Sequence, residues 1–286
     1  MADRGVSRAI RELVRQVPRR SYALTKWRML RRMERPTEDP IVVFCMSKTA
    51  SSAIVRAVRN ADPRPVYKIH LLTAEGVAQA EAHYRQTDPS ARPRHILHAS
   101  HLLRHLPTPE HPWHVVTIVR EPIARSASEF FQSGERLGHL GDETTIGARF
   151  ARFATSQGIP RTIDWFDREL EPTLGIDVYA QPFDPVTGYS VIETPAVRLL
   201  LLRQESLPDA PRALRDFLGL SHDLDLQREN EGSSKEYSDL YAAVLREVRF
   251  PVEALDLAYG SRFAQHFYAP DEIDELRARW GQPPLA

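Results

Sequence analysis

The stretch that most constrains the fold is 41–58, where a short apolar run leads directly into a polar turn and then into a helix-like pattern. Residues 41–45 have the length and composition of a buried strand, and 47–52 supply a lysine and several hydroxyls. A strand, a turn and a helix N-terminus in this order bring free backbone N–H groups and the positive end of the helix dipole together. The stretch therefore predicts an anion-binding turn.

A second unit of the same kind follows at 114–134. It predicts a strand over 114–119 and a helix over 123–132, with Pro122 at the first turn, where proline is tolerated. Arg120 ends the strand and Ser128 lies eight residues later. An arginine and a helix hydroxyl can hold a phosphate by charge-assisted hydrogen bonds, while Arg125 either joins them or supports the loop.

The remaining apolar patterns alternate between strand-like and helix-like. They predict strands over 65–71, 94–99 and 197–203, and helices over 51–60, 74–84 and 211–218. This alternation favours an α/β protein with a parallel sheet flanked by helices. The tail from Ser233 is predicted to be helical in two or three pieces, the last starting at Pro270.

Two further segments differ from this pattern. Residues 135–195 read as an irregular insertion over the sheet edge and a plausible wall for an acceptor substrate. Residues 1–36 carry eleven Lys and Arg against three Asp and Glu, and predict a basic helical N-terminal extension. That extension is either a solvated helix or a peripheral contact with an anionic membrane. We therefore expect one domain over 37–286.

Composition excludes several classes of protein. The chain has 286 residues with Lys+Arg 38 and Asp+Glu 38, so nothing global indicates a nucleic-acid partner. Cys45 is the one cysteine, which we expect to be a buried small apolar residue rather than a nucleophile. No apolar run approaches the ~20 residues of a membrane span, and the N-terminus lacks the apolar core of a signal peptide. We expect a cytoplasmic protein.

The first loop lacks the glycines of a nucleoside-triphosphate P-loop before Lys48 and Thr49. It suits one terminal phosphate group, with Lys48 neutralising charge on a leaving oxygen and the hydroxyls donating hydrogen bonds. The alternative is that Ser51 or Ser52 is simply a helix N-cap and Lys48 a surface charge.

The motifs KTASS at 48–52 and VREPIARSAS at 119–128 together resemble the cofactor-binding pair of sulfotransferases. The Lys-Thr-Ala-Ser form is most similar to the uronyl and heparan sulfate 2-O-sulfotransferases. Many members of that superfamily have glycine where this chain has Ala50. The resemblance implies binding of 3′-phosphoadenosine-5′-phosphosulfate (PAPS), with 3′-phosphoadenosine 5′-phosphate (PAP) as the product and no metal.

Much of 41–280 also resembles a bacterial family described as putative capsular polysaccharide synthesis proteins. The matching stretches include VYKIHLL (66–72), WFDREL (165–170), LLLRQESL (200–207) and NEGSSKEYSDLY (230–241). The two resemblances imply a P-loop-like sulfotransferase fold with a helical C-terminal part. They assign the 5′ end of the nucleotide to Ser47, Lys48, Thr49, Ala50, Ser51 and Ser52, the 3′-phosphate to Arg120 and Ser128, and closure over the nucleotide to Lys235 within 230–235.

Sulfuryl transfer needs a base for the acceptor hydroxyl, and histidine suits this role near neutral pH. The family position of a catalytic histidine falls near His98 or His101, and His70 is a third candidate. Carboxylate alternatives are Glu121, Asp167 and Glu169, of which the last two can instead recognise the acceptor. His98, His101 and His105 have a spacing that could bind zinc, but no supporting motif accompanies them, and we expect no metal.

These observations favour a PAPS-dependent sulfotransferase acting on a glycan or glycoconjugate, with a natural-product alcohol or phenol as another acceptor. One alternative is a P-loop phosphotransferase, for which Glu205 is the best available Mg²⁺ ligand. The other is a scaffold that binds a nucleotide or glycan without catalysis. The sequence does not indicate the oligomeric state.

Overall fold

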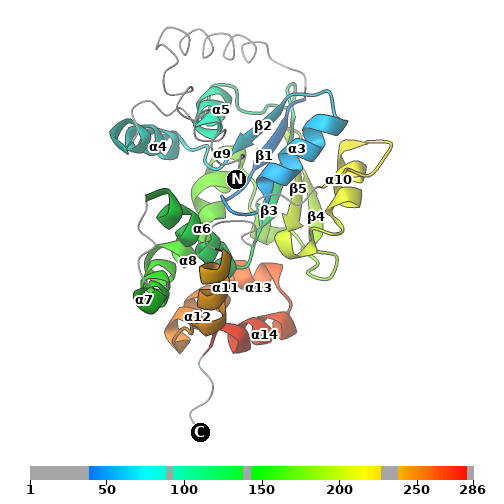
Figure 1. Ribbon diagram of the computed structural model, residues 1–286. Coiled ribbons are helices and arrows are strands. Elements are labelled where there is room, and N and C mark those ends of the chain that lie inside the picture. The colour runs from blue at the N-terminus through cyan, green and yellow to red at the C-terminus, as the bar shows by residue number, and fades with distance from the viewer. Residues whose placement is uncertain (1–38, 88–92, 138–142, 227–237, 282–286) are drawn as a thin grey trace, which may run out of the picture. The chain divides into compact units, whose positions relative to one another are not determined.

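The computed structural model describes residues 39–87, 93–137, 143–226 and 238–281. The described part contains a five-stranded sheet in the order β2-β1-β3-β5-β4 (Figure 1). Its strands are β1 (Ile41–Phe44), β2 (Val66–Ile69), β3 (Trp113–Val119), β4 (Tyr189–Glu193) and β5 (Val197–Arg203). β4 alone runs antiparallel to its neighbour, as an edge strand. The prediction of an α/β fold with a largely parallel sheet is confirmed.

The helices near the strands agree with the sequence predictions to within a few residues. They are α3 (Ser51–Ala61), α4 (Ala74–Thr87), α6 (Pro122–Leu137) and α10 (Ala210–Leu218). The C-terminal part is helical, as predicted, in α11 (Ser238–Glu247), α12 (Val252–Tyr259), α13 (Arg262–Phe267) and α14 (Pro270–Trp280). Within the described residues, no helix combines the length and apolar character that a bilayer crossing requires.

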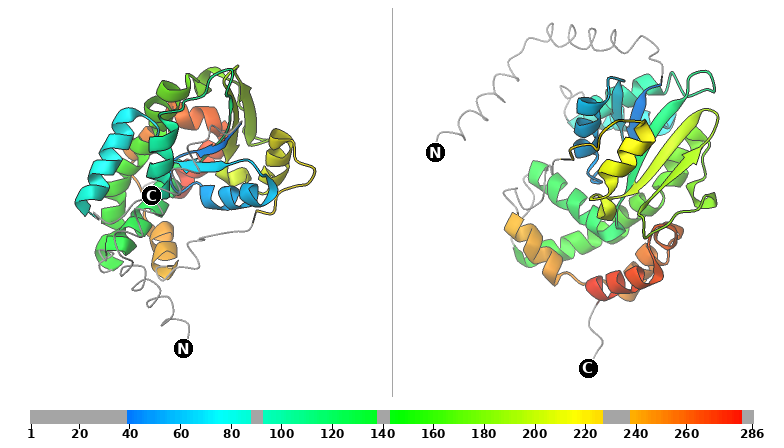
Figure 2. Two further views of the ribbon diagram at one scale, coloured as in Figure 1. Left: turned by 90° about the horizontal axis from the view of Figure 1, so that it is seen from above. Right: turned by 90° about the vertical axis from the view of Figure 1, so that its right-hand side faces the viewer.

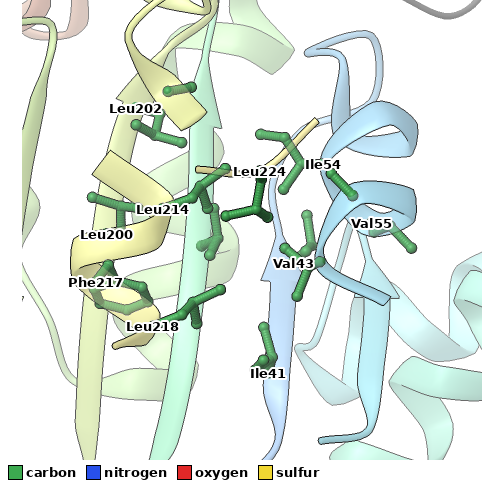
Figure 3. Close-up of a cluster of buried hydrophobic side chains, with 14 of the residues drawn as sticks. Ile41, Val43, Ile54, Val55, Leu200, Leu202, Leu214, Phe217, Leu218 and Leu224 are labelled. Carbon is green, nitrogen blue, oxygen red and sulfur yellow. The ribbon is translucent and has the colours of Figure 1, made fainter. Parts of the chain in front are cut away.

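One face of the sheet is covered by α3 and α10. Figure 3 shows Val43 and Leu200 pointing from the sheet toward Ile54 of α3 and Leu214 of α10. The buried residues of α10 recur at helical spacing, namely Ala210, Ala213, Leu214, Phe217 and Leu218. This packing fixes α3, and therefore the turn that precedes it, against the carboxyl end of β1.

The prediction of an irregular insertion over 135–195 is wrong for most of that segment. Much of it is helical, in α7 (Glu143–Phe153), η1 (Ala154–Gly158), α8 (Ile159–Ile163), η2 (Phe166–Leu170), α9 (Glu171–Leu174) and the short η3 (Val178–Ala180), and it also forms β4. The segments η1 and η2 are π-helical, with i→i+5 hydrogen bonds. Such turns displace the apolar pattern from the 3.6-residue period, which hides the helices from a periodicity search.

These helices pack on the sheet face opposite α3. Trp165 makes an edge contact with Phe44 of β1, with ring centroids 5.0 Å apart. Gly158 lies so close to α6 that a Cβ there would be 2.4 Å from Ser126 Oγ, so a larger residue would push η1 away. Figure 2 shows the C-terminal helices beyond this layer, and Phe166 contacts Phe263 and Phe267 of α13.

The prediction of a strand over 94–99 is also wrong, since these residues begin α5 (Arg94–Leu102). The helix packs on β2, and its buried residues Ile96, Ala99 and Leu102 recur every third position. The backbone N–H of Lys68, on the free edge of β2, meets the His98 imidazole instead of another strand. A side chain therefore completes the sheet edge.

Candidate functional site

The first loop connects β1 to α3 and has an unusual backbone. Lys48 and Ala50 have positive φ values of 71° and 59°, and they alternate with residues at negative φ. Successive backbone N–H groups in such alternating conformations converge on one point and form an anion-binding concavity. Left-handed backbone at residues other than glycine costs free energy and concentrates at functional sites. The loop therefore has a backbone conformation suited to an anion.

The side chains of the loop divide between inward and outward positions. Thr49 is fully buried, and its hydroxyl donates to Met46 O at 2.9 Å, so this side chain stabilises the turn from the protein interior. Ser51 is also buried, whereas Ser52 is exposed and its Oγ accepts from Lys68 Nζ at 2.8 Å. Ala50 supplies no side-chain cap to α3. The N-terminus of this helix is thus capped by backbone geometry rather than by a hydroxyl.

The second unit meets the first at its loop. Arg120 follows β3, and its Nη1 donates to Lys48 O at 3.0 Å. Ser128 lies two turns into α6 and is partly buried. β1 and β3 are neighbours and parallel, so their carboxyl ends lie at the same edge of the sheet. The structure therefore brings Arg120 to the loop that contains Lys48.

Arg125 supports the loop from the protein interior. Its side chain is 3% exposed, and Nη1 donates to Ser47 O at 3.2 Å. The same guanidinium pairs with Glu129 at 2.6 Å and donates from Nε to Thr162 Oγ1 at 2.6 Å. With these partners Arg125 positions the loop, which is the supporting role that the sequence left as one of two options.

His70 follows β2 and lies beside the start of the loop. Its Nδ1 is 2.7 Å from Cys45 O. Because a carbonyl only accepts, Nδ1 carries the proton and the lone pair resides on Nε2. Burial, and to a smaller extent the charges of His95, Lys68 and Lys48, lower the pKa of His70 to about 3. The imidazole is therefore neutral, with its basic nitrogen directed away from the strand.

His98 and His101 lie on α5 and cover Tyr67 of β2. Their ring centroids are 5.3 and 5.8 Å from that of Tyr67. His98 Nδ1 lies 3.0 Å from Lys68 N and 3.2 Å from Lys68 O, so it accepts from the N–H in one tautomer and donates to the carbonyl in the other. Burial lowers the pKa of both histidines to about 4. As candidate bases, His98 and His101 both remain predictions.

The carboxylates named by the sequence have partners within the protein. Glu121 is buried and accepts from the N–H groups of Ile123 and Ala124 at 2.7 and 2.6 Å, so it caps α6. Tyr259 also donates to it at 2.7 Å, and burial raises the pKa of Glu121. Glu205 accepts from the Glu121 N–H at 2.9 Å and from the Tyr268 hydroxyl at 3.3 Å.

The two carboxylates of the WFDREL stretch are also engaged. Glu169 accepts from the N–H groups of Leu72 and Thr73 at 2.8 and 3.1 Å and so holds the turn before α4. Asp167 pairs with Arg262 at 2.5 Å on the surface. Trp165, in the same stretch, donates from Nε1 to His70 O at 2.9 Å. The stretch therefore orders the segment after β2 that carries His70.

Cys45 is fully buried, and burial raises the pKa of its thiol, so it is the small apolar core residue that the sequence predicted. In the part of the chain that the structure describes, no three His, Cys, Asp or Glu side chains are grouped to hold a metal. Lys235, the segment 230–235 and the extension 1–36 lie outside the described residues. Their predicted roles stay predictions.

Sequence reasoning missed Lys68 as a site residue. Its ammonium reaches Ser52 at the start of α3, and its backbone meets His98. The available signal was scarcity, since the chain has only four lysines among its 38 basic residues, at 26, 48, 68 and 235.

The fold and this site define an α/β protein with two strand-end loops joined around a potential anion-binding turn. Residues 154–269 match the sequence model of a family described as "Putative capsular polysaccharide synthesis protein". That segment begins after both loops and includes β4 and β5. It also contains Thr162, which accepts a hydrogen bond from Arg125, and Trp165, which donates one to His70 O. No curated protein and no solved structure matches the chain. The similarity therefore covers less than half of the chain, in its later part.

Proposed function

We propose that the protein is a sulfotransferase that uses PAPS to sulfate a hydroxyl of a glycan or glycoconjugate. The observation that carries the proposal is the hydrogen bond from Arg120 to the carbonyl of Lys48, which joins the two loops at one sheet edge. A cofactor with phosphates at both ends needs two such sites side by side. The name of the matching family, which refers to capsular polysaccharide, supports a glycan as the acceptor.

The residues fit this cofactor in charge and backbone conformation. The alternating backbone of Ser47, Lys48, Thr49 and Ala50, with the first turn of α3 at Ser51 and Ser52, would hold the 5′ phosphosulfate. Arg120 and Ser128 would hold the 3′-phosphate. When bound, PAPS supplies an activated sulfuryl group with PAP as its leaving group. Lys48 would stabilise the negative charge that develops on the departing oxygen.

We take His70, the third candidate from the sequence, as the base, because the hydrogen bond from its Nδ1 to Cys45 O leaves the lone pair on Nε2. Nδ1 stays protonated and donates its hydrogen bond to the Cys45 carbonyl, and Nε2 takes the proton of the attacking hydroxyl. Burial and the neighbouring cations make this imidazole a weak base in the protein as described. Burial is the largest cause of the low pKa, and negative charge held beside Lys48 and Lys68 would offset only the smaller contribution of those two cations.

A phosphotransferase function has weaker support. It requires an acidic Mg²⁺ ligand at a strand end, and the sequence offers Glu205 for this role. Both oxygens of Glu205 accept hydrogen bonds within the protein, from Glu121 and Tyr268.

Calorimetric titration of the protein with PAP, ADP and ATP–Mg²⁺ tests the proposal. We expect PAP to bind at micromolar concentration or tighter, with weak binding of ADP. Arg120→Ala should weaken PAP binding at least tenfold, whereas Arg149→Ala, at an exposed position of α7, should leave it unchanged. If the protein prefers ATP–Mg²⁺, phosphoryl transfer becomes the better proposal than sulfuryl transfer. If it binds none of the three nucleotides, a scaffold without catalysis is favoured.

Transfer of labelled sulfate from PAPS to a panel of glycans tests the roles of single residues. Lys48→Ala should abolish transfer in a protein that still folds. His70→Asn should lower kcat by about 10²–10⁴ with little effect on PAP affinity. If His70→Asn keeps full turnover and His98→Asn loses it, the base is His98 of α5 and not His70.

A further inference from the structure

Trp165 and the π-helical turn η2 contact the backbone that follows His70. Trp165 donates from Nε1 to His70 O at 2.9 Å. Glu169, in η2, accepts through Oε2 from Leu72 N at 2.8 Å and from Thr73 N at 3.1 Å. Together these three hydrogen bonds fix the backbone from His70 to Thr73.

Both side chains that make these contacts are buried. Trp165 is 4% exposed and its ring packs on Phe44 of β1, while Glu169 is 9% exposed. A buried carboxylate costs free energy unless hydrogen bonds compensate it, and here the donors are the N–H groups of the turn. Departures from an apolar interior and from regular α-helix concentrate at functional sites. Glu169 in its π-helical turn combines the two.

The first turn of α4 leaves room for the Glu169 carboxylate because residue 76 is glycine. A Cβ at Gly76 would lie 2.7 Å from Glu169 Oε1 and 2.8 Å from Thr73 Oγ1. Contacts this short are not tolerated, so alanine at this position would displace the carboxylate from the turn. Alanine would otherwise be the better helix former. The glycine therefore preserves the contact between η2 and the turn.

The position of the His70 imidazole depends on this backbone. Nδ1 donates to Cys45 O at 2.7 Å, and this hydrogen bond leaves the lone pair on Nε2. The carbonyl follows β1 and the histidine follows β2, so the bond forms only while the chain leaving β2 keeps its direction. A shift of that backbone would break the bond and allow either ring nitrogen to carry the proton.

We propose that Trp165 and Glu169 are positioning residues for His70, which hold the turn after β2 so that the proton stays on Nδ1 and the lone pair on Nε2. The inference rests on the proposed function in taking His70 as the base, and it adds two residues that act through that base. It gives Glu169 neither a proton-transfer step nor a contact with the acceptor.

NMR of nitrogen-labelled histidine rings in the full chain tests this role without a substrate. We expect His70 to carry its proton on Nδ1. Trp165→Phe, Glu169→Ala and Gly76→Ala should each populate the tautomer protonated on Nε2. Glu169→Gln retains an acceptor oxygen and should preserve the original tautomer. If Trp165→Phe and Glu169→Ala both keep the proton on Nδ1, the inference is overturned.

Two control variants separate positioning from a general loss of stability. Tyr259→Phe removes a buried hydrogen bond between α12 and Glu121, and should lower stability without changing the His70 tautomer. Glu171→Gln removes an exposed carboxylate two residues after Glu169 and should change neither property. A tautomer change in Tyr259→Phe as large as that in Trp165→Phe would overturn the inference.

Sulfate transfer from PAPS to the glycan panel then separates this inference from the proposed function. Trp165→Phe should lower kcat about tenfold, the equivalent of one hydrogen bond, with PAP affinity unchanged. The loss should vanish in the His70→Asn background, because the two residues act as one unit. An equal loss in both backgrounds would overturn the positioning role. The expected tautomer changes in a chain that neither binds PAP nor transfers sulfate would overturn the proposed function and leave the positioning of His70 standing.

Discussion

Replacing Ala50 by glycine should stabilise the protein. Ala50 has φ 59° and ψ 15°, a left-handed conformation that costs an L-residue about 1–2 kcal/mol relative to glycine. Glycine also gains entropy in the unfolded chain, which offsets about 0.4–1 kcal/mol of this benefit. The expected net effect of Ala50→Gly is an increase of about 0.5–1 kcal/mol in the free energy of unfolding, or roughly 2–3 °C in Tm for a chain of this size.

Two matched variants make this prediction specific to the backbone conformation. Ala53→Gly, in the first turns of α3 at negative φ, should lower the free energy of unfolding by up to about 1 kcal/mol. Ala50→Val should also destabilise the protein, because a β-branched residue tolerates positive φ poorly. Urea unfolding monitored by circular dichroism measures all three. If Ala50→Gly destabilises the protein as much as Ala53→Gly, the reasoning about left-handed strain in the loop is refuted.

Three further predictions concern buried polar groups. Tyr259→Phe removes the donor to Glu121 and should lower the free energy of unfolding in urea by about 1.5 kcal/mol. An unchanged unfolding midpoint would show that this hydrogen bond does not stabilise the protein. Thr117→Val removes the 2.7 Å hydrogen bond to Phe44 O and should lower the free energy of unfolding by about 1 kcal/mol. Equal or higher stability of the variant would contradict this prediction. Because the folded pKa of His98, about 4, lies below its unfolded value, its contribution to stability is present above pH 6.5 and is lost as pH falls toward 4. His98→Gln should therefore flatten the decline in Tm between pH 6.5 and 4, and an unchanged slope would show that His98 does not contribute.

The sequence predicted the strands and helices wherever apolar spacing was regular. The seven-residue strand 197–203 and the start of the last helix at Pro270 needed no tertiary information, because a continuous apolar run and a first-turn proline are local signals. The segment 94–99 was mistaken for a strand because a six-residue run does not distinguish the two periods. In the fold the helix packs on Tyr67 and Lys68 of β2, contacts that the run itself does not reveal.

The candidate site was only partly predictable for a related reason. Lys48 and Arg120 follow apolar strands, so their position at the carboxyl edge of the sheet follows from the order of elements. The roles of Thr49, Glu121 and Glu169 do not, because each side chain turns inward to a backbone group whose position depends on the finished fold. Residue type alone cannot separate a hydroxyl or carboxylate that faces a ligand from one that holds a turn.

The contacts of Arg125 have a consequence for how the chain can be divided. The family match begins at residue 154, yet Thr162 and Gly158 within it hold the guanidinium that fastens Ser47. A fragment cut at that boundary would retain β4 and β5 but lose β3, the strand that pairs along the whole of β5. The limit of sequence similarity is therefore not a place to truncate an expression clone, because two halves of one hydrogen-bonded core would be separated there.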